Sequence, residues 1–530
     1  MKKLFLLFTL FLLFSSCKSV EKHNKQITKL HSVDDLRIDI DKLYGQLKRN
    51  HPKLYQYILK EDLDFKFDSL KNALNTPITS RELYKNLAPV LTLIGQGHIA
   101  VGSAGKRFTR KEQKVLKKNP FEFDNLDFDY VDDKLWVKRN FGKDSGLVGA
   151  QVVSFNGAEV KDLADTFKTR FASDGFNTTL HNRFVGKGFS RFYAKDHGLV
   201  DSLQVTFKNK DSIFLRHYKR IYKIEKGLET DSIQSKKAKP IKLSKAEKKE
   251  NRLAKKKRRK DHRKFGFISK SNEYTRNFSF IGQDSSVAYM KIRSFSNGNY
   301  KKFYKESFRK LDSAKTKNFI LDLRDNFGGR IPEVDHLYAY LTSESYVFIE
   351  PSEVNGRLPV IKFLLSNGNP ALYRIVGALA IVEPFTLAWQ YSKTKKVDGK
   401  LYFKMKYNKP RKPNELNYKG HMYVLTNGNS FSASSLISTH LKANERATFV
   451  GEETGGAHNG CVAGFYRIYK LPNSKLKVRM GLMQIEAPQK QEPDGYGVKP
   501  DVIISPNLTD VQSHIDTELE WILKDIHKQE

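Results

Sequence analysis

The sequence predicts an α/β protein in which a strand–helix core follows a helical region and a β-rich segment. Apolar residues recur with a helical period from Leu36 to Leu47. Short strands bounded by glycines follow between about 125 and 208, and strands alternate with helices from about Phe280 onward. With 530 residues and 39% hydrophobic content, the chain is long enough to form more than one packed core.

Residues 1–17 predict an export signal of the bacterial lipoprotein type. Lys2 and Lys3 precede an apolar run that ends at Phe14, and Ser15 and Ser16 lead to Cys17. This run is too short to span a membrane, and a cysteine directly after small residues is typical of a site that is cleaved and acylated. We therefore expect an exported protein, lipid-anchored through Cys17 in the cell envelope, on the periplasmic or outer-membrane face. The alternative is an ordinary signal peptide that happens to contain Cys17.

No later segment reaches the ~18 consecutive apolar residues of a membrane-spanning helix, so none is expected. Cys461 is the only other cysteine. A lipidated Cys17 would leave it without a disulfide partner within the chain.

The first half of the mature chain divides into three predicted parts. Residues 18–31 are polar and predict a tether, and residues 32–115 predict a helical region that ends near His98. Residues 116–214 predict a β-rich domain in which a Gly-bounded strand, an Asn156-Gly157 turn and a helix from about Val160 follow one another. This order resembles the middle of a PDZ domain, a module that binds extended peptide ends. A small unrelated β-rich domain is the alternative.

Much of the chain's net charge of +36 lies in a predicted insertion or linker over 215–272. Lys236 to Lys264 contains 16 basic and 3 acidic residues, few large apolar residues and no aromatic residues. Such a segment cannot bury a core, so a solvated helix or a disordered insertion is expected. Binding to anionic lipid or envelope polymers is the functional alternative. Nucleic acid is disfavoured because no aromatic residues interleave the charges.

Residues 273–506 predict the strand–helix core, and residues 507–530 predict a C-terminal helix. The strand Met422–Thr426 leads through small residues into a helix from about Ser432 to Lys442. The N–H groups at the start of a helix are free, and the helix dipole is positive there. A serine at this place could serve as an acyl-transfer nucleophile, or it could simply cap the helix.

Three Gly-rich turns accompany this serine segment. Asp322-Leu323-Arg324-Asp325-Asn326-Phe327-Gly328-Gly329 follows one strand, Gly451-Glu452-Glu453-Thr454-Gly455-Gly456 follows another, and Gly495-Tyr496-Gly497-Val498-Lys499-Pro500-Asp501 comes last. Each turn alone is ordinary turn chemistry. The set, in this order after Gly97-His98 and the PDZ-like segment, resembles the tail-specific, or carboxyl-terminal-processing, serine proteases, which include the core of tricorn protease. This resemblance implies a crotonase-like core over about Phe280 to Pro506.

The resemblance also implies the site residues. Ser432 matches the nucleophile, and the backbone N–H groups of Ala433 and of Gly328 or Gly329 match the oxyanion hole. Many members use a lysine 25 residues after the nucleophile, but here that residue is Ala457. The resemblance to the tricorn-like branch therefore implies His98 as the base and Asp494 as the acid that orients it, although Gln96 replaces an aspartate that is common there.

Alternatives remain for the partners of Ser432. His458 is a rival base, Glu452 and Glu453 are rival acids, and both His98 and Asp494 could be plain turn residues. No residues have metal-ligand spacing and no phosphate-binding loop is present, so no cofactor or metal is expected.

We expect a serine endopeptidase that cleaves other envelope proteins through an acyl-enzyme. The first alternative is an inactive family member that binds peptides or apolar ligands. A weaker alternative is an anchoring protein that acts through the Lys236–Lys264 segment.

Overall fold

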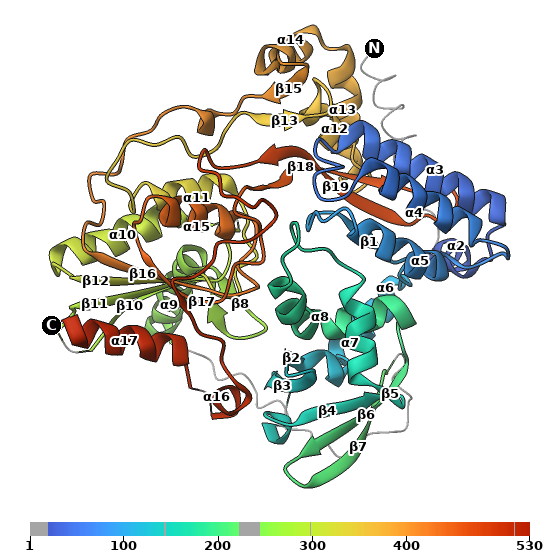
Figure 1. The fold of residues 1–530 in the computed structure, drawn as a ribbon. Helices are drawn as coiled ribbons and strands as arrows, with labels where there is room; N and C mark the ends of the chain where they lie inside the picture. Colours follow the sequence, from blue (N-terminus) through green and yellow to red (C-terminus); the bar gives the residue numbers. More distant parts are fainter. Residues whose placement is uncertain are drawn as a thin grey trace.

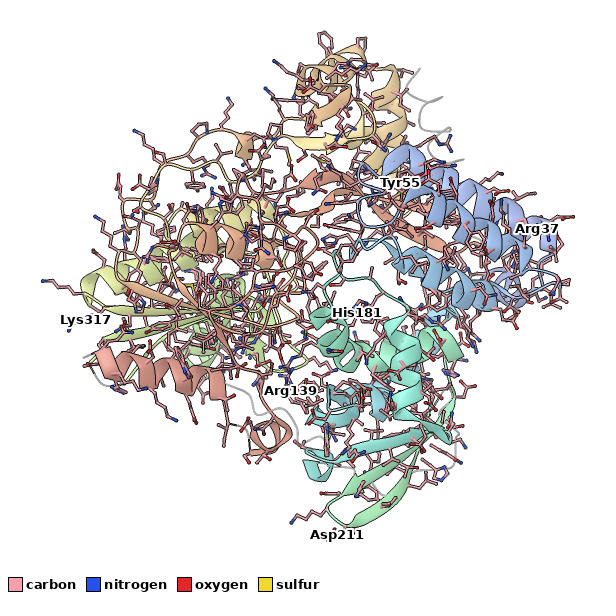
Figure 2. All side chains as sticks on the ribbon, in the orientation of Figure 1. Arg37, Tyr55, Arg139, His181, Asp211 and Lys317 are labelled. Carbon is pink, nitrogen blue, oxygen red and sulfur yellow. The ribbon has the colours of Figure 1, made fainter. Side chains whose placement is uncertain are left out.

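The computed structural model describes residues 20–142, 145–221, 244–282, 284–296, 298–513 and 515–529 (Figure 1). The expected signal with Cys17, and residues 236–243 of the basic segment, lie outside this part of the chain. A strand–helix body, a helical body and a β-rich domain surround the middle of the molecule (Figure 1). His181 lies at this middle, whereas Arg37, Asp211 and Lys317 lie at the outer ends of the three bodies (Figure 2).

A six-stranded sheet forms the strand–helix body, which confirms the predicted α/β class. Its order is β10 (Arg276–Ile281), β11 (Val287–Ile292), β12 (Asn318–Asp322), β16 (His421–Thr426), β17 (Thr448–Gly451) and β20 (Val502–Ile503). Only β10 pairs antiparallel with its neighbour; β11 to β20 are parallel. β12 and β16 are buried on both faces, which explains their nearly continuous apolar sequences.

Helices cover both faces of this sheet. α10 (Tyr300–Ser313), α11 (Ile331–Tyr338) and α15 (Ala433–Ala443) pack over one face in a large apolar cluster, and α17 (Thr517–Gln529) packs over the other through Ile522 and Ile526. Because β12 and β16 are parallel neighbours, their carboxyl ends meet at one sheet edge. This edge brings the Gly328-Gly329 turn beside Ser432.

A long hairpin links the strand–helix body to the helical body. Its strands are β18 (Cys461–Lys470) and β19 (Lys477–Ile485), and β1 (Ala100–Gly102) adds to β19. The helical body consists of α2 (Val20–Thr28), α3 (Val33–Asn50), α4 (Lys60–Asn72) and α5 (Ser80–Thr92). Val478 and Met480 belong to the buried cluster of these helices, whereas Met483 and Ile485 belong to the cluster of the strand–helix body. The predicted 32–115 region and the predicted 273–506 core therefore share this hairpin.

The β-rich domain has the sheet order β2, β3, β4, β6, β7. Its elements are β2 (Leu126–Val131), β3 (Lys134–Asn140), β4 (Gln151–Phe155), β5 (Ala158–Glu159), β6 (Ser202–Asn209), β7 (Ser212–Lys219), α7 (Val160–Lys168) and α8 (Thr179–His197), and α6 (Arg110–Lys118) precedes them. The expected strand, Asn-Gly turn and helix from Val160 are present. The long α8, which was not expected, covers the sheet. The likeness to a PDZ domain stays a prediction.

The described part of the basic segment is α9 (Lys245–Phe265), a solvated helix with no buried residue. Ser244 and Glu247 form its capping box, and Gly266 ends it in a left-handed conformation. β8 (Phe267–Ile268) and β9 (Glu273–Tyr274) follow.

An insertion over 352–403 was not foreseen. It contains β13 (Ser352–Val354), α12 (Pro359–Leu364), α13 (Ala371–Val382), α14 (Pro384–Lys393), β14 (Thr394–Val397) and β15 (Lys400–Phe403). Among the described helices, none is long and apolar enough to cross a membrane by itself. α13 and α14 pass that test only as a pair, and they are bent by 86°. At the end of the chain, the single predicted helix is two: α16 (Leu508–Ser513) and α17.

Candidate active site

Ser432 is half-buried and occupies the turn between β16 and α15 in a strained backbone conformation. Its φ of 59° and ψ of −117° are unusual for a residue other than glycine, and such a conformation costs about 1–3 kcal/mol. Although Ser432 is the N-cap of α15, its side chain makes no capping hydrogen bond. The neighbouring Ser430 serves the fold instead, because its hydroxyl donates to the Leu323 carbonyl at 2.9 Å. Capping therefore does not explain Ser432.

Two N–H groups beside Ser432 are suited to bind an oxyanion. The N–H of Ala433 is the first of α15, and among the described residues neither it nor the N–H of Gly329 has a hydrogen-bond acceptor. The N–H of Gly328 instead donates to the Asn326 side chain at 2.9 Å. Of the two glycines that the sequence left open, Gly329 is therefore the available donor.

Gly328 instead allows the turn after β12 to approach the nucleophile turn closely. Its φ is +85°, and a Cβ there would lie 2.6 Å from both the Ala433 nitrogen and the Phe431 carbonyl oxygen. Asn326 holds the same junction, since its carbonyl accepts from the Phe431 N–H and its amide donates to the Ile292 carbonyl. The turn after β12 is thus built against the nucleophile turn.

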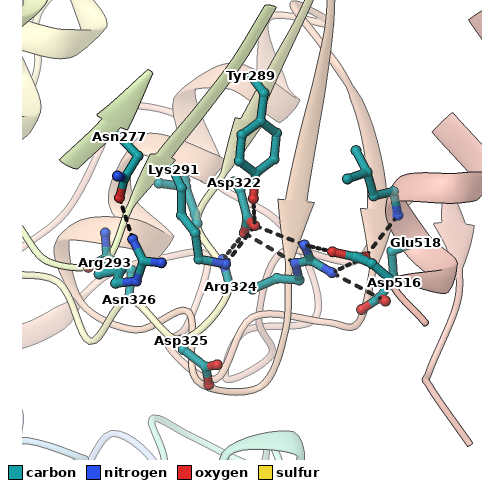
Figure 3. Close-up of polar contacts among 12 residues, drawn as sticks. Asn277, Tyr289, Lys291, Arg293, Asp322, Arg324, Asp325, Asn326, Asp516 and Glu518 are labelled. Carbon is teal, nitrogen blue, oxygen red and sulfur yellow. Dashed lines mark hydrogen bonds and ion pairs between the residues drawn. The ribbon is translucent and has the colours of Figure 1, made fainter. Parts of the chain in front are cut away.

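A buried ion network anchors this turn to the sheet and to α17 (Figure 3). The Asp322 carboxylate accepts from the Tyr289 hydroxyl at 2.5 Å and from Lys291 at 2.7 Å, and it also pairs with Arg324. Arg324 reaches on to Asp516, 2.7 Å away. Burial alone would raise the pKa of Asp322, but Lys291 and Arg324 outweigh it and hold that pKa far below its usual range. The Asp-x-Arg-x-Asn-x-Gly-Gly pattern thus encodes an anchored loop.

His98 lies against Ser432 although 334 residues separate them in sequence. Its Nε2 atom is 3.1 Å from the Ser432 hydroxyl oxygen, and its Nδ1 atom is 3.3 Å from the Tyr466 hydroxyl. The rings of Phe431 and Tyr466 flank the imidazole, and only 8% of His98 is exposed. Its carbonyl accepts from Arg479 at 3.1 Å, which fixes the backbone from β19.

Burial, and then the nearby positive charge of Arg479, lower the pKa of His98 to about 3. The imidazole is therefore neutral at neutral pH and can accept a proton at Nε2 from Ser432. This requires the proton on Nδ1, which can then donate to the Tyr466 oxygen. Burial holds the pKa of Tyr466 above its usual value, so the phenol stays uncharged.

Asp494 does not contact His98 directly, which differs from the expected triad. Its carboxylate accepts from the Gln56 side chain at 2.8 Å and from the Tyr57 hydroxyl at 3.5 Å. Gln56 in turn accepts from the Gln96 amide at 3.0 Å, two residues before His98. Asp494 thus reaches the loop of His98 through two glutamines.

The rival residues have other partners in the structure. The His458 ring bonds to Asn459 at 3.2 Å, Glu452 pairs with Arg183, and Glu453 accepts from the Gly497 N–H. Ala457, at the place of the family lysine, lines a cavity together with Ser432.

Sequence reasoning missed two residues near the catalytic pair. Tyr466 is one, and Asp174 is the other: it is buried, accepts from the Gly97 N–H at 2.8 Å, and leaves its Oδ2 atom without a hydrogen-bond partner among the described residues. Burial, partly opposed by hydrogen bonds from Gly97 and Ala457, raises the pKa of Asp174 to about 7. Asp174-Gly175 has the composition of an ordinary surface turn, so no sequence signal marks it.

Ser432 lies between two cavities. One, of about 390 Å³, has mainly apolar walls that include Ile331, Leu436, Phe465 and Met483. The other, of about 610 Å³, lies on the His98 side and is lined by five basic side chains and by no acidic one: Arg170, Arg191, Lys195, Lys477 and Arg479. Among the described residues, no three His, Cys, Asp or Glu side chains gather as metal ligands would.

Comparisons with known proteins agree with this architecture. Residues 286–504 match the model of peptidase family S41. The solved structure of mature CPAF complexed with lactacystin is similar over 94% of this chain and 98% of that one, with a TM-score of 0.61 and 14% identity. The structure of mature CPAF alone matches over 92% and 95%, with a TM-score of 0.57 and 14% identity. At such identity these structures show the shared fold. A search of curated protein sequences found no match.

The matched residues include β11 to β20 of the sheet, the oxyanion turn and the nucleophile turn, and the resemblance seen in the sequence is confirmed. Residues 286–504 belong to peptidase family S41, and the chain is a serine-type peptidase.

Proposed function

We propose that this protein is an exported endopeptidase that cleaves other proteins through an acyl-enzyme on Ser432. The observation that carries the proposal is the 3.1 Å contact between Nε2 of the neutral His98 and the hydroxyl of the half-buried Ser432. Its location is part of the proposal: the signal pattern at 1–17 supports export and a lipid anchor on Cys17 in the cell envelope.

The reaction starts when the Ser432 oxygen attacks the scissile carbonyl carbon and its proton passes to Nε2 of His98. The N–H groups of Gly329 and Ala433 bind the resulting oxyanion. The same proton then moves from Nε2 to the leaving amine nitrogen as the C–N bond breaks, which leaves an ester on Ser432. Water attacks the ester in the second half, gives a proton to Nε2, and Ser432 takes that proton back as the acid product leaves.

Asp494 acts indirectly in this scheme. Through Gln56 and Gln96 it holds the loop that carries His98, and it is a positioning residue. Tyr466 orients the imidazole directly and keeps the proton on Nδ1.

The two cavities suggest which substrates bind. The apolar cavity fits a large apolar side chain on one side of the scissile bond. The basic cavity favours acidic groups on the other side, either side chains or a terminal carboxylate.

Labelling with a fluorophosphonate tests the site. The wild-type chain should be labelled on Ser432 and should cleave a denatured protein, whereas Ser432→Ala and His98→Ala should lose both properties. Ser434→Ala is the matched control and should keep both. Labelling that survives in Ser432→Ala would refute the nucleophile, and a stable wild-type chain that binds peptides without cleaving them would favour the binding-protein alternative.

A further inference from the structure

The insertion carries a large exposed apolar surface on α13 and α14, here called the α13–α14 surface. Phe385 is 84% exposed, Val382 76%, Leu372 68% and Leu379 61%. Further exposed side chains on the two helices are Tyr373, Ile375, Val376, Ile381, Trp389 and Tyr391. Contiguous apolar patches of this kind are rare on soluble monomers unless they bind something.

These helices bury few residues against the rest of the protein. In α13 only Gly377 and Ala380 are buried, and in α14 only Gln390. A Cβ on Gly377 would lie 2.8 Å from the Leu364 Cβ, so α13 packs tightly on α12 along this face. The large apolar side chains therefore point away from the protein, and they do not contribute to a core.

Basic residues follow the apolar surface. Over 371–404 the chain has six basic residues, Arg374, Lys393, Lys395, Lys396, Lys400 and Lys404, against the two acidic residues Glu383 and Asp398. Lys395, Lys396 and Lys404 are exposed and form no ion pair within the described ranges. Exposed lysines beside apolar, Trp and Tyr side chains are the composition of helices that lie in the headgroup region of a bilayer.

We propose that the α13–α14 surface docks onto an anionic membrane surface. The exposed apolar residues of α13 occur at successive positions around the helix, which suits a fluid environment better than the single face of another protein. Neither helix spans a bilayer: α13 has 12 residues, or about 18 Å at ~1.5 Å per residue, against a hydrocarbon core of about 30 Å. The sharp bend between them keeps both helices at the surface.

Docking here would hold the active site near the membrane. α12, on which α13 packs, contacts β18 through Phe363 and Phe465, whose ring centroids are 5.5 Å apart. Phe465 lines the apolar cavity beside Ser432. This proposal is independent of the lipid anchor on Cys17.

Vesicle binding by a chain without residues 1–17, which keeps every described residue, tests the proposal. Sedimentation should show binding to phosphatidylcholine vesicles that contain phosphatidylglycerol, and weaker binding to phosphatidylcholine alone. Leu379→Glu/Phe385→Glu should reduce binding by about ten-fold or more, because two apolar side chains leave the bilayer. Lys395→Glu/Lys396→Glu should reduce only the electrostatic contribution to vesicle binding, which is the contribution that added salt also weakens. Ile213→Glu/Leu215→Glu, on the exposed strand β7, is the matched control and should bind normally.

A second readout requires no charge substitution on the surface. Trp389 is the most exposed of the three tryptophans, so lipids brominated on their acyl chains should quench its fluorescence, and Trp389→Phe should remove that quenching. Cleavage of a soluble peptide should be unchanged in every variant, which separates this proposal from the proposed catalytic site. Two results would overturn the proposal. One is the absence of both Trp389 quenching and vesicle binding. The other is a soluble dimer that dissociates in Leu379→Glu/Phe385→Glu, which would assign the surface to a second copy of the chain.

Discussion

The imidazole of His98 is oriented by the phenol of Tyr466, whose oxygen lies 3.3 Å from Nδ1, and not by a carboxylate. A neutral partner fixes the tautomer of the base, but it stabilises the imidazolium less than a negative charge would. Tyr466 lies on β18 and His98 just before β1, so the hairpin that joins the two bodies also sets the geometry of the base.

Replacing Tyr466 by Phe should therefore slow catalysis without preventing binding. The ring and its packing remain, but Nδ1–H loses its acceptor. We expect kcat to fall by about 10- to 100-fold, less than the ~10²–10⁴-fold that a general acid–base group itself contributes, with little change in KM. Steady-state hydrolysis of a peptide measures this, and Tyr469→Phe on the same strand is the control. Equal losses in both variants would indicate damage to the hairpin.

The pH dependence of kcat/KM should extend unusually far toward acid. Only neutral His98 can accept the Ser432 proton, and its folded-state pKa is lowered to about 3, so activity is lost only as pH falls through values well below 6.5. Activity on an uncharged peptide should be nearly level from pH 7 to pH 5. An acid limb centred near pH 6.5 would mean that the imidazole is solvated in the working enzyme.

Asp494→Asn should have a milder effect than Tyr466→Phe. Asp494 reaches only the loop of His98, through Gln56 and Gln96, so we expect a loss of less than about ten-fold in kcat and an unchanged acid limb. The same pH series measures both quantities. A loss as large as that of His98→Ala would instead assign Asp494 a direct role during turnover.

Gly328→Ala should disable the oxyanion hole although its own N–H is not a donor. The added Cβ would meet the Ala433 nitrogen at 2.6 Å and displace that donor. Loss of one donor lowers the rate by about 10²–10³-fold. The rate of acylation by a fluorophosphonate reports this step, and Gly399→Ala, in an open turn, is a control for the loss of a glycine.

Asp322→Ala should destabilise the fold. It would leave Lys291 and the buried Arg324 without their shared partner, and breaking a buried ion pair costs about 3–5 kcal/mol in the free energy of unfolding. Urea denaturation followed by circular dichroism measures the change. Lys302→Ala removes an exposed pair with Glu306 and should change stability by about 1 kcal/mol or less.

The sequence predicted the parts of this protein that rest on local patterns. Local patterns predicted the buried strands, the Gly-rich turns that follow them and a helix that begins at Ser432, whereas the family resemblance implied the oxyanion role of Gly328 or Gly329. Family resemblance, and not local pattern, paired His98 with Ser432. Tyr466 and Asp174 were missed because each reaches the site through tertiary packing of a segment that looks like an ordinary strand or turn.

The insertion was missed for a related reason. Its apolar residues are interrupted by Gly377 and by Glu383-Pro384, so no run is long enough to predict a membrane helix. Only the structure shows that these side chains are exposed.

The hairpin β18–β19 also has a consequence for biosynthesis. During synthesis, the base His98 emerges early and the nucleophile Ser432 emerges hundreds of residues later. The strands β18 and β19, which contact His98, emerge after both of them. Until residue 485 has emerged and that strand pair has closed, the base lacks its contacts with Tyr466 and Arg479, and the site is incomplete. The order of synthesis thus delays assembly of the site until folding is nearly complete.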